Sequence, residues 1–222
     1  MGILTRLWSY LSDGPFQLPR REYSHFHKIV IPTTRGTTEI DHLIVSRFGV
    51  FVVELKDYSG WILGSAADPF WTAVYFKRKY RFQNPLHQNF GHLKAVEELL
   101  RVDPRALHGL VVFRGSFRFK TPVPSGVLLH RYRAWVAAHQ DVMLDAMTVA
   151  RSVATLDTHG KRGWLAGWTH ARSVRARYAS DTVCPKCGGA LHVRTARRGS
   201  NTGSQFLGCT NYPKCKFTKP VG

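Results

Sequence analysis

The cysteine distribution constrains this chain more than any other feature. All four cysteines lie between residues 184 and 215, with two residues between Cys184 and Cys187 and five between Cys209 and Cys215. Two thiolate pairs carried on turns are the usual way to build a closed tetrahedral zinc site. A segment of about 35 residues cannot bury enough apolar surface to fold alone, so a metal must supply the missing stability. The spacing therefore predicts a zinc ribbon that holds one structural Zn²⁺.

The positive charge of the chain is concentrated toward its C-terminal end. The formal net charge is +18, and residues 161–222 carry 12 Lys and Arg against one acidic residue. Such an excess favours a polyanionic partner, with nucleic acid as the first choice and an acidic membrane as the second. No run of about 18 apolar residues is present, and the first residues are too polar for a signal peptide. We expect a cytoplasmic protein without a membrane span, in which cysteines remain reduced.

Two strand-like runs in the first half of the chain predict a β-hairpin. Residues 37–46 and 49–57 are rich in apolar and β-branched residues, and Arg47 and Phe48 separate them. With a two-residue loop, the numbers of facing residues sum to 95. Because side chains alternate between faces, each strand presents an apolar set to both sides. The hairpin is therefore expected to lie in the centre of the sheet.

Four charges fall on one face at one end of this hairpin. The predicted register sets Asp41 across from Glu54, and Glu39 across from Lys56. Opposed carboxylates destabilise a sheet by up to ~1 kcal/mol, which a divalent cation between them would relieve. Mg²⁺ prefers oxygen ligands and keeps waters, and Lys56 would orient one such water for hydrolysis. The alternative is a solvated hairpin end with a Glu39–Lys56 ion pair.

A helix is predicted from Pro85 to Arg101, with Asn84 as its N-cap. Gln88 and His92 lie on its flank, one turn apart, where they would either reach a site at the sheet edge or be solvated. The pattern also predicts an apolar stripe on this helix, formed by Leu86, Phe90, Leu93, Val96 and Leu100.

The remaining segments give weaker signals. Residues 110–113 and 126–130 are predicted strands, and residues 142–156 a helix. A basic helix over residues 161–179 is expected to pack on the first domain through Trp164, Trp168, Ala171, Val174 and Tyr178. Trp61 and Trp71 are expected in the core, and His25 and His27 alternate along a first strand without metal geometry to another histidine.

The cysteine-rich segment resembles a known module. CPKCGGALHVRTARRGSNTGSQFLGCTNYPKCKFTKP is similar to the zinc finger repeated at the C-terminus of bacterial type IA topoisomerases, and FLGCTNYPKC is its most specific block. The resemblance implies binding of single-stranded DNA. Cations for phosphates and rings for bases are also what a sequence-tolerant single-strand binder uses. The candidate nucleic-acid contacts are Arg194, Arg197, Arg198, Phe206, Tyr212, Lys214 and Lys216.

The first half of the chain resembles the nuclease-related domain of bacterial proteins, within the PD-(D/E)xK nuclease superfamily. The segments that carry this likeness are TTEIDHLIVSRFGVFVVELKDYSGWILGS, FWTAVYFKRKYRFQNPLHQNFGHLKAVEELL and LHGLVVF. The resemblance implies that Asp41 and Glu54 bind Mg²⁺ or Mn²⁺, that Lys56 is the catalytic lysine, and that Gln88 is a helical site residue. The family usually begins with a helix bearing a Gly-Glu motif, which residues 1–23 lack. Either Glu39 replaces the Glu of that motif, or the site is weakened, or the N-terminus was lost.

These patterns together predict an α/β fold with a mixed central sheet flanked by helices, of the restriction-endonuclease-like type, followed by a small zinc ribbon. The expected units are a nuclease-related domain over residues 1–158, a basic helical linker over 159–182 and the zinc module over 183–222. The expected function is divalent-metal-dependent hydrolysis of DNA, with the ribbon holding single-stranded or junction DNA. The alternative is a DNA-binding adaptor that keeps the nuclease fold with little or no catalysis. An acidic membrane as partner remains the third option.

Overall fold

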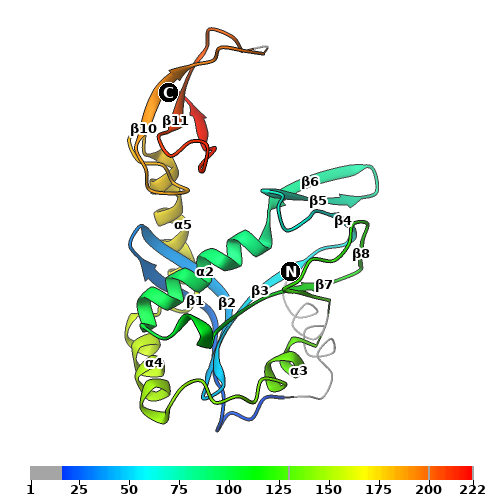
Figure 1. Ribbon diagram of the computed structural model, residues 1–222, viewed down its shortest axis with the longest axis vertical. Helices are drawn as coiled ribbons and strands as arrows, with labels where there is room; N and C mark the ends of the chain where they lie inside the picture. Colours follow the sequence, from blue (N-terminus) through cyan, green and yellow to red (C-terminus); the bar gives the residue numbers. More distant parts are fainter. Residues whose placement is uncertain (1–16, 130, 200, 222) are drawn as a thin grey trace.

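The computed structural model describes residues 17–129, 131–199 and 201–221. A five-stranded mixed sheet forms the centre of the protein, in the order β1-β2-β3-β7-β9 (Figure 1). Neighbours among the first three strands are antiparallel, whereas β7 runs parallel to both β3 and β9. The bounds are Ser24–Thr33 for β1, Gly36–Ser46 for β2, Gly49–Asp57 for β3, Leu107–Arg114 for β7 and Val127–Leu128 for β9. The predicted mixed sheet is therefore confirmed.

The central hairpin has the predicted register along most of its length. Pairs from His42–Val53 to Ser46–Gly49 each sum to 95, and Arg47 and Phe48 form the loop. On the N-terminal side of His42, β2 remains paired with β1, as in the pair Val30–Glu39. The corresponding part of β3, on the C-terminal side of Val53, remains paired with β7. The two strands thus part at the end that carries the charges, which leaves room for side chains between them.

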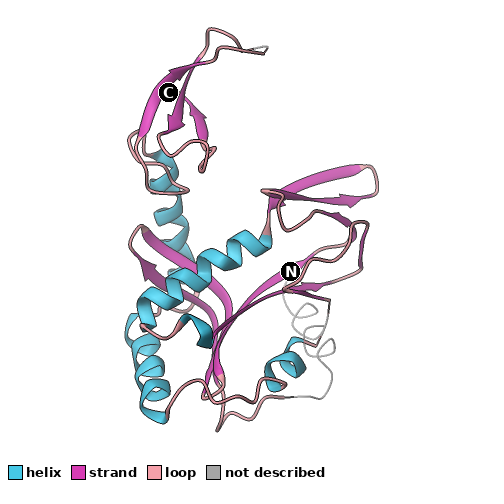
Figure 2. Cartoon of the chain, viewed as in Figure 1, coloured by secondary structure: helices cyan, strands magenta, loops and turns pink. Residues whose placement is uncertain are grey.

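Helices cover both faces of this sheet (Figure 2). α2 (Pro85–Leu100) and α4 (Ala146–His159) pack on one face, against a core that includes Leu43, Val50 and Val52. The short α3 (Tyr132–Ala137) lies on the other, beside a second core with Ile44 and Phe51. A single 3-10 turn, η1 (Pro104–Ala106), leads into β7.

Two helix predictions need correction. α4 begins at Ala146 rather than at residue 142, because the Asp145 carboxylate accepts a hydrogen bond from the Thr148 amide and fixes the helix start. In α2 the expected stripe is rotated: Phe90 is 60% exposed, while Asn89 and His92 are buried. Gly109 of β7 permits this, since a Cβ there would collide with the Leu93 and Asn89 side chains. Polar residues of α2 consequently face the sheet.

A second sheet, ordered β6-β5-β4-β8, extends from the first (Figure 1). Its strands are β4 (Gly60–Leu63), β5 (Phe70–Tyr75), β6 (Arg78–Gln83) and β8 (Phe117–Phe119). Trp71 is fully buried at its base, as expected, and its indole N–H donates to the Ser65 carbonyl. Trp61 is instead 52% exposed, with the Lys120 ammonium 4.3 Å from its ring centroid.

The C-terminal part consists of helix α5 (Trp164–Ala179) and a three-stranded sheet of β10 (Leu191–Thr195), β11 (Gln205–Cys209) and β12 (Thr218–Pro220). α5 packs on β1 and β2, as expected for the basic helix. The contact side differs from the predicted one, because Trp168 and Tyr178 are 64% and 50% exposed while Ala166 is buried. None of the helices described is both long and apolar enough to cross a membrane.

Candidate functional site

One large cleft of about 1190 Å³ joins the parted end of the hairpin to the C-terminal ribbon. Its floor comprises α2 and the ends of β2 and β3, including Asp41, Glu54 and Gln88. Its walls include α5, the base of the β5–β6 hairpin and the ribbon residues Lys186 and Lys216. Four of the predicted catalytic residues, Glu39, Asp41, Glu54 and Gln88, and the predicted nucleic-acid residue Lys216 therefore line the same space.

Glu54 is the most connected residue of this site. Its side chain is almost fully buried, and its Oε1 lies 2.6 Å from the Lys56 ammonium. The same ammonium donates a 3.0 Å hydrogen bond to Gln88 Oε1. On the other side, Glu54 Oε2 lies 3.3 Å from His92 Nε2. The structure thus brings Glu54, Lys56 and Gln88 together, from two predicted strand positions and one predicted helix position.

Asp41 occupies the gap where β2 leaves β3. Its Oδ2 accepts a 2.9 Å hydrogen bond from the Leu55 amide. The carboxylate therefore supplies the acceptor that a continued ladder would have taken from the β2 backbone. This contact holds Asp41 beside Glu54, and both face the α2 side of the sheet.

The pKa values of the two carboxyl groups are shifted in opposite directions. Burial, followed by repulsion from Glu54, raises the pKa of Asp41, against the opposing effects of the Leu55 amide and Lys56. Burial also acts to raise the pKa of Glu54, but His92 and Lys56 outweigh it, and the pKa of Glu54 is lowered. At neutral pH the ionised Glu54 is stabilised by its neighbours, whereas the negative charge on Asp41 is destabilised by its surroundings.

Glu39 takes a different position from the one predicted. Its Oε2 lies near Gly167 of α5, and its negative charge acts on His170 of the same helix. It does not pair with Lys56, which is engaged by Glu54 instead. The expected Glu39–Lys56 pairing is absent because β2 follows β1 beyond His42 and no longer runs opposite β3.

His92 is buried in the site rather than solvated on the flank of α2. Its Nδ1 lies 3.0 Å from Thr38 Oγ1, and its Nε2 faces Glu54 without the geometry of a hydrogen bond. Because a carboxylate only accepts, the favourable tautomer has its proton on Nε2 and accepts from the Thr38 hydroxyl at Nδ1. Thr38 was not predicted as a site residue, because regular alternation sets it on the strand face opposite to Glu39 and Asp41.

Asp41 and Glu54 fit a divalent cation by their chemistry. Two adjacent carboxylates in a cleft offer the oxygen ligands that Mg²⁺ and Mn²⁺ prefer. Burial and then repulsion from Glu54 raise the pKa of Asp41, and a cation between the two carboxylates would cancel the repulsion. Among the described residues, however, no third carboxylate or histidine lies close enough to both to complete a three-ligand cluster. The Gly-Glu helix expected from the family likeness would fall largely on residues 1–16, outside the described part of the chain.

The four cysteines converge as predicted. Their sulfur atoms all lie within 4.8 Å of one another. The Cys184–Cys215 and Cys187–Cys209 sulfurs are 3.7 and 3.2 Å apart, compared with about 3.8 Å for four sulfurs at about 2.3 Å from one tetrahedral Zn²⁺. The Asn211 amide and side chain lie within hydrogen-bond reach of Cys209 and Cys187 sulfur, which stabilises thiolate charge. The cluster fits a structural zinc ion.

The ribbon presents most of its predicted nucleic-acid residues to solvent. Tyr212 is 61% exposed, and Phe206 of β11 is half-buried. Arg194 partly turns inward, because its guanidinium donates to the Cys209 carbonyl. The exposed cations of the ribbon include Lys186, Arg194, Arg197, Arg198, Lys214 and Lys216.

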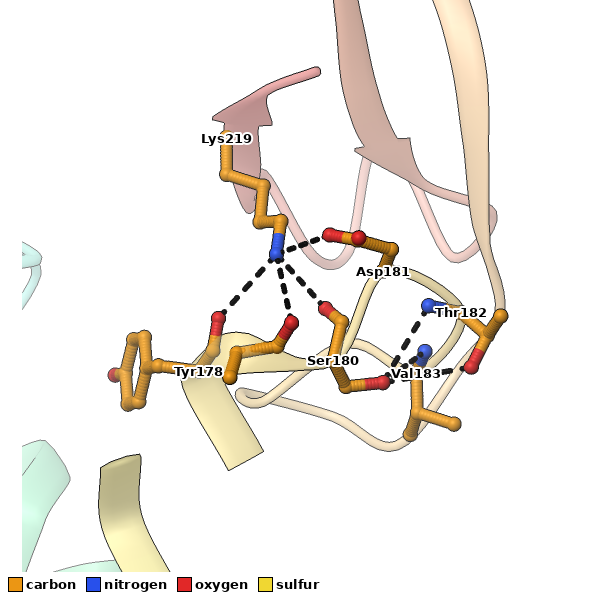
Figure 3. Close-up of polar contacts among 7 residues, drawn as sticks. Tyr178, Ser180, Asp181, Thr182, Val183 and Lys219 are labelled. Atoms are coloured by element: carbon orange, nitrogen blue, oxygen red, sulfur yellow. Dashed lines mark hydrogen bonds and ion pairs between the residues drawn. The ribbon is translucent and has the colours of Figure 1, made fainter. Parts of the chain in front are cut away.

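A lysine fastens the ribbon to the end of α5 (Figure 3). The Lys219 ammonium of β12 lies 3.4, 3.3 and 3.0 Å from the carbonyl oxygens of Tyr178, Ala179 and Ser180, and pairs with Asp181. A cation is favourable at the carbonyl end of a helix. Arg35, between β1 and β2, adds a 3.1 Å hydrogen bond to the Lys186 carbonyl. The ribbon is therefore held against the cleft by side-chain contacts as well as by the chain.

Three histidines meet on the opposite face of the sheet, where sequence reasoning expected no such cluster. His25 Nδ1 lies 3.0 Å from His42 Nε2, and His42 Nδ1 lies 2.9 Å from the Tyr132 hydroxyl. His27 stacks on His42, and ligand nitrogens of all three lie within 4.8 Å. Burial and the charge of Arg133 lower the pKa of each histidine, and the neighbouring rings lower the pKa of His25 and His42 further. We interpret the cluster as a neutral hydrogen-bonded network, since its positive neighbour disfavours a cation.

Two family comparisons agree with the architecture. Residues 5–114 match the family described as nuclease-related domain. Residues 181–222 match the topoisomerase DNA binding C4 zinc finger. No solved structure matches the chain.

Individual relatives cover one part of the chain or the other. An uncharacterized protein of Bacillus anthracis is 46% identical over 85 residues, which is 38% of this chain and 40% of that protein. DNA topoisomerase 1 of Archaeoglobus fulgidus is 53% identical over 54 residues, 23% of this chain and 8% of that enzyme. DNA topoisomerase 1 of Methanocaldococcus jannaschii is 46% identical over 41 residues, which is 18% of this chain and 5% of that enzyme. The matches therefore span less than half the length of these relatives.

Proposed function

We propose that this chain, a DNA-binding protein in which a nuclease-related domain precedes a topoisomerase-type zinc ribbon, hydrolyses phosphodiester bonds in DNA with a divalent metal. The observation that carries the proposal is the arrangement around Glu54. A buried carboxylate and a glutamine line one cleft, and the ammonium of a lysine lies 2.6 Å from that carboxylate and donates to that glutamine. Together with Asp41, these residues are the site residues that the resemblance to the PD-(D/E)xK nucleases implies.

Asp41 and Glu54 would hold the Mg²⁺ or Mn²⁺ ion. When bound, such an ion activates a water as nucleophile and offsets negative charge on the phosphate. The protein's own residues prepare this site. His92 and Lys56 keep Glu54 ionised at neutral pH, and the Leu55 amide fixes the orientation of Asp41.

Lys56 is the residue we assign to the reaction itself. Gln88 of α2 and Glu54 hold its ammonium, so the positive charge has a fixed position beside two residues that line the cleft. A fixed ammonium donates to an attacking water and stabilises the charge that develops on the phosphate oxygens in the transition state. We assign His92 a positioning role, because it contacts Glu54 and is anchored by Thr38.

The substrate is proposed to be single-stranded or junction DNA. The ribbon lies beside the cleft and carries exposed cations together with Tyr212 and Phe206, the combination that binds unpaired bases and phosphates. Lys186 and Lys216 line the cleft from the ribbon side. A strand held by the ribbon is therefore proposed to continue into the cleft that contains Glu54.

A specific observation favours a second candidate, a DNA-binding adaptor without catalysis. Within the described residues, Asp41 and Glu54 have no third acidic neighbour, and Glu39 points to α5. Such a site would hold a metal weakly and still leave the DNA-binding surface intact.

A cleavage assay separates the two candidates. Supercoiled plasmid and end-labelled single-stranded DNA are incubated with the full chain, with Mg²⁺, with Mn²⁺ or with no added metal. The enzyme proposal predicts cleavage only with metal, and a rate loss of about 100-fold or more for Lys56→Ala at unchanged DNA affinity. Lys94→Ala is the matched control, because Lys94 also lines the cleft but pairs with Glu97. DNA binding without cleavage under either metal would establish the adaptor instead.

A further inference from the structure

The β5–β6 hairpin forms an arm that projects from the body on the same side as the ribbon (Figure 1). This arm, residues 70–83, contains four basic residues and no acidic one. All four basic side chains are exposed, and none takes part in an ion pair among the described residues: Lys77, Arg78, Lys79 and Arg81. Four exposed cations on one hairpin repel one another and attract a polyanion.

One face of the arm is directed toward the cleft. Pairing of Phe70 with Gln83 and of Thr72 with Arg81 sets these residues on one face, and Phe70 and Gln83 line the cleft. The Arg81 guanidinium lies 4.9 Å from the Phe70 ring centroid, and Lys186 of the ribbon lies 5.4 Å from it. The arm and the ribbon thus form two basic walls that meet at Phe70.

The tip of the arm shows an aromatic residue in an unusual conformation. Phe76 and Lys77 form the two-residue loop, since Tyr75 pairs with Arg78. Phe76 has φ +53° and is 85% exposed. A first loop residue with positive φ is normally Gly, because a bulky side chain is strained there. Phe76 makes a ring contact only with its neighbour Tyr75 among the described residues. Its ring therefore adds strain and exposed apolar surface without contributing to the core.

We propose that this arm binds single-stranded DNA, with Phe76 stacking on an unpaired base and the four cations contacting phosphates. The inference rests on the proposed DNA-binding function and assigns it a second contact surface. Strain and exposed aromatic surface at a loop tip are features of ligand-contacting sites. A stacked duplex offers no free base face to such a ring, so the arm prefers an unpaired strand.

The test uses the full chain and fluorescence anisotropy with a labelled 30-nucleotide oligothymidylate, without added divalent metal. Phe76→Gly is the informative variant, because it removes the ring and restores the residue that the loop conformation favours. Loss of one base–aromatic stack weakens binding about 5- to 150-fold. The same variant should melt at the same or a higher temperature than the parent protein, because the strain is relieved. The matched control is Met147→Ala on α4, where an apolar side chain is 81% exposed far from the cleft.

The charges are tested by a second variant, Arg78→Ala combined with Lys79→Ala. Two lost phosphate contacts should reduce the slope of log affinity against log salt by about 1.4. Arg151→Ala on α4 should leave the slope unchanged, because Arg151 is exposed there away from the arm.

Each outcome decides the proposal. Parental affinity of Phe76→Gly would overturn it, and so would a joint loss of affinity and melting temperature, which would show a structural role. An equal loss of affinity for a duplex of the same length would overturn the single-strand preference. Failure of the parent protein to bind DNA would instead refute the proposed function, whereas binding without cleavage leaves the arm fully testable.

Discussion

Neutralising the two carboxylates of the cleft should change stability in opposite directions. Asp41→Asn should stabilise the protein in the absence of added metal, because Asn keeps the acceptor for the Leu55 amide and removes a charge disfavoured by burial and by Glu54. Glu54→Gln should destabilise it, because the variant leaves Lys56 and His92 without their negative partner. If repulsion between the two carboxylates were the only interaction, both variants would raise the stability of the protein.

The magnitudes follow from the contacts. Like charges facing one another in a sheet cost up to ~1 kcal/mol, so Asp41→Asn should gain about that amount at pH 7. A charged hydrogen bond contributes about 1.5–3 kcal/mol, and Glu54 is 4% and Lys56 18% exposed in their side chains. Glu54→Gln should therefore lose about 2 kcal/mol.

The pH dependence gives a check on the cause. The pKa of Glu54 is lowered in the folded state, so its contribution is present above the unfolded value near 4.5 and is lost as pH falls through the folded value. The pKa of Asp41 is raised, so its unfavourable contribution is present above the folded value and is relieved as pH falls toward 3.8. Both variants should thus approach the parent protein in acid.

Urea unfolding of the full chain at pH 7, 4 and 3, monitored by tryptophan fluorescence, measures these differences; Asp41→Asn should approach the parent protein by pH 4, and Glu54→Gln only at the lowest pH. Gln83→Ala, an exposed cleft residue, is the control for nonspecific effects. Destabilisation by both variants at pH 7, or a gain from Glu54→Gln, would refute the electrostatic assignment.

Three further predictions concern the rest of the molecule. Cys209→Ser should release zinc and unfold the ribbon while sparing the central sheet, seen by elemental analysis and circular dichroism; a zinc-free parent protein would contradict this. Deletion of residues 183–222 should weaken single-strand binding and flatten its salt dependence, and equal affinity at matched salt would remove the ribbon from the DNA surface. The pKa of His25 is lowered to about 4 by burial and by its charged neighbours, so stability should fall as pH drops from 7 to 5, and His25→Gln should reduce that fall in urea unfolding; an unchanged pH dependence would argue against the neutral network.

Features set by local alternation and residue spacing could be predicted from the sequence. Apolar alternation placed the hairpin register correctly from His42 to Gly49, and the cysteine spacing predicted the cluster. Asn84 and Pro85 located the start of α2, where the Asn84 side chain accepts from the Leu86 amide. These are local signals, readable without knowledge of the tertiary partners.

Long-range contacts escaped the same reasoning. The predicted pairing of β2 with β3 was extended to Glu39. In the structure that part of β2 pairs with β1, and the Glu39 side chain lies near α5. The burial of His92 depends on how closely α2 approaches β7 at Gly109, which helical periodicity does not reveal. His42 joins His25 and His27 through strand pairing that the alternation of one strand could not predict.

The central claim is that Asp41 and Glu54 together form the binding site for a divalent metal, and calorimetric titration of the zinc-loaded full chain with Mn²⁺ tests it most directly. We expect one Mn²⁺ to bind per chain in addition to the zinc. This binding should be lost in both Asp41→Asn and Glu54→Gln. It should be kept in Lys56→Ala, because Lys56 is assigned to the reaction and not to the ion. Equal Mn²⁺ binding by the parent protein and both carboxylate variants would contradict it.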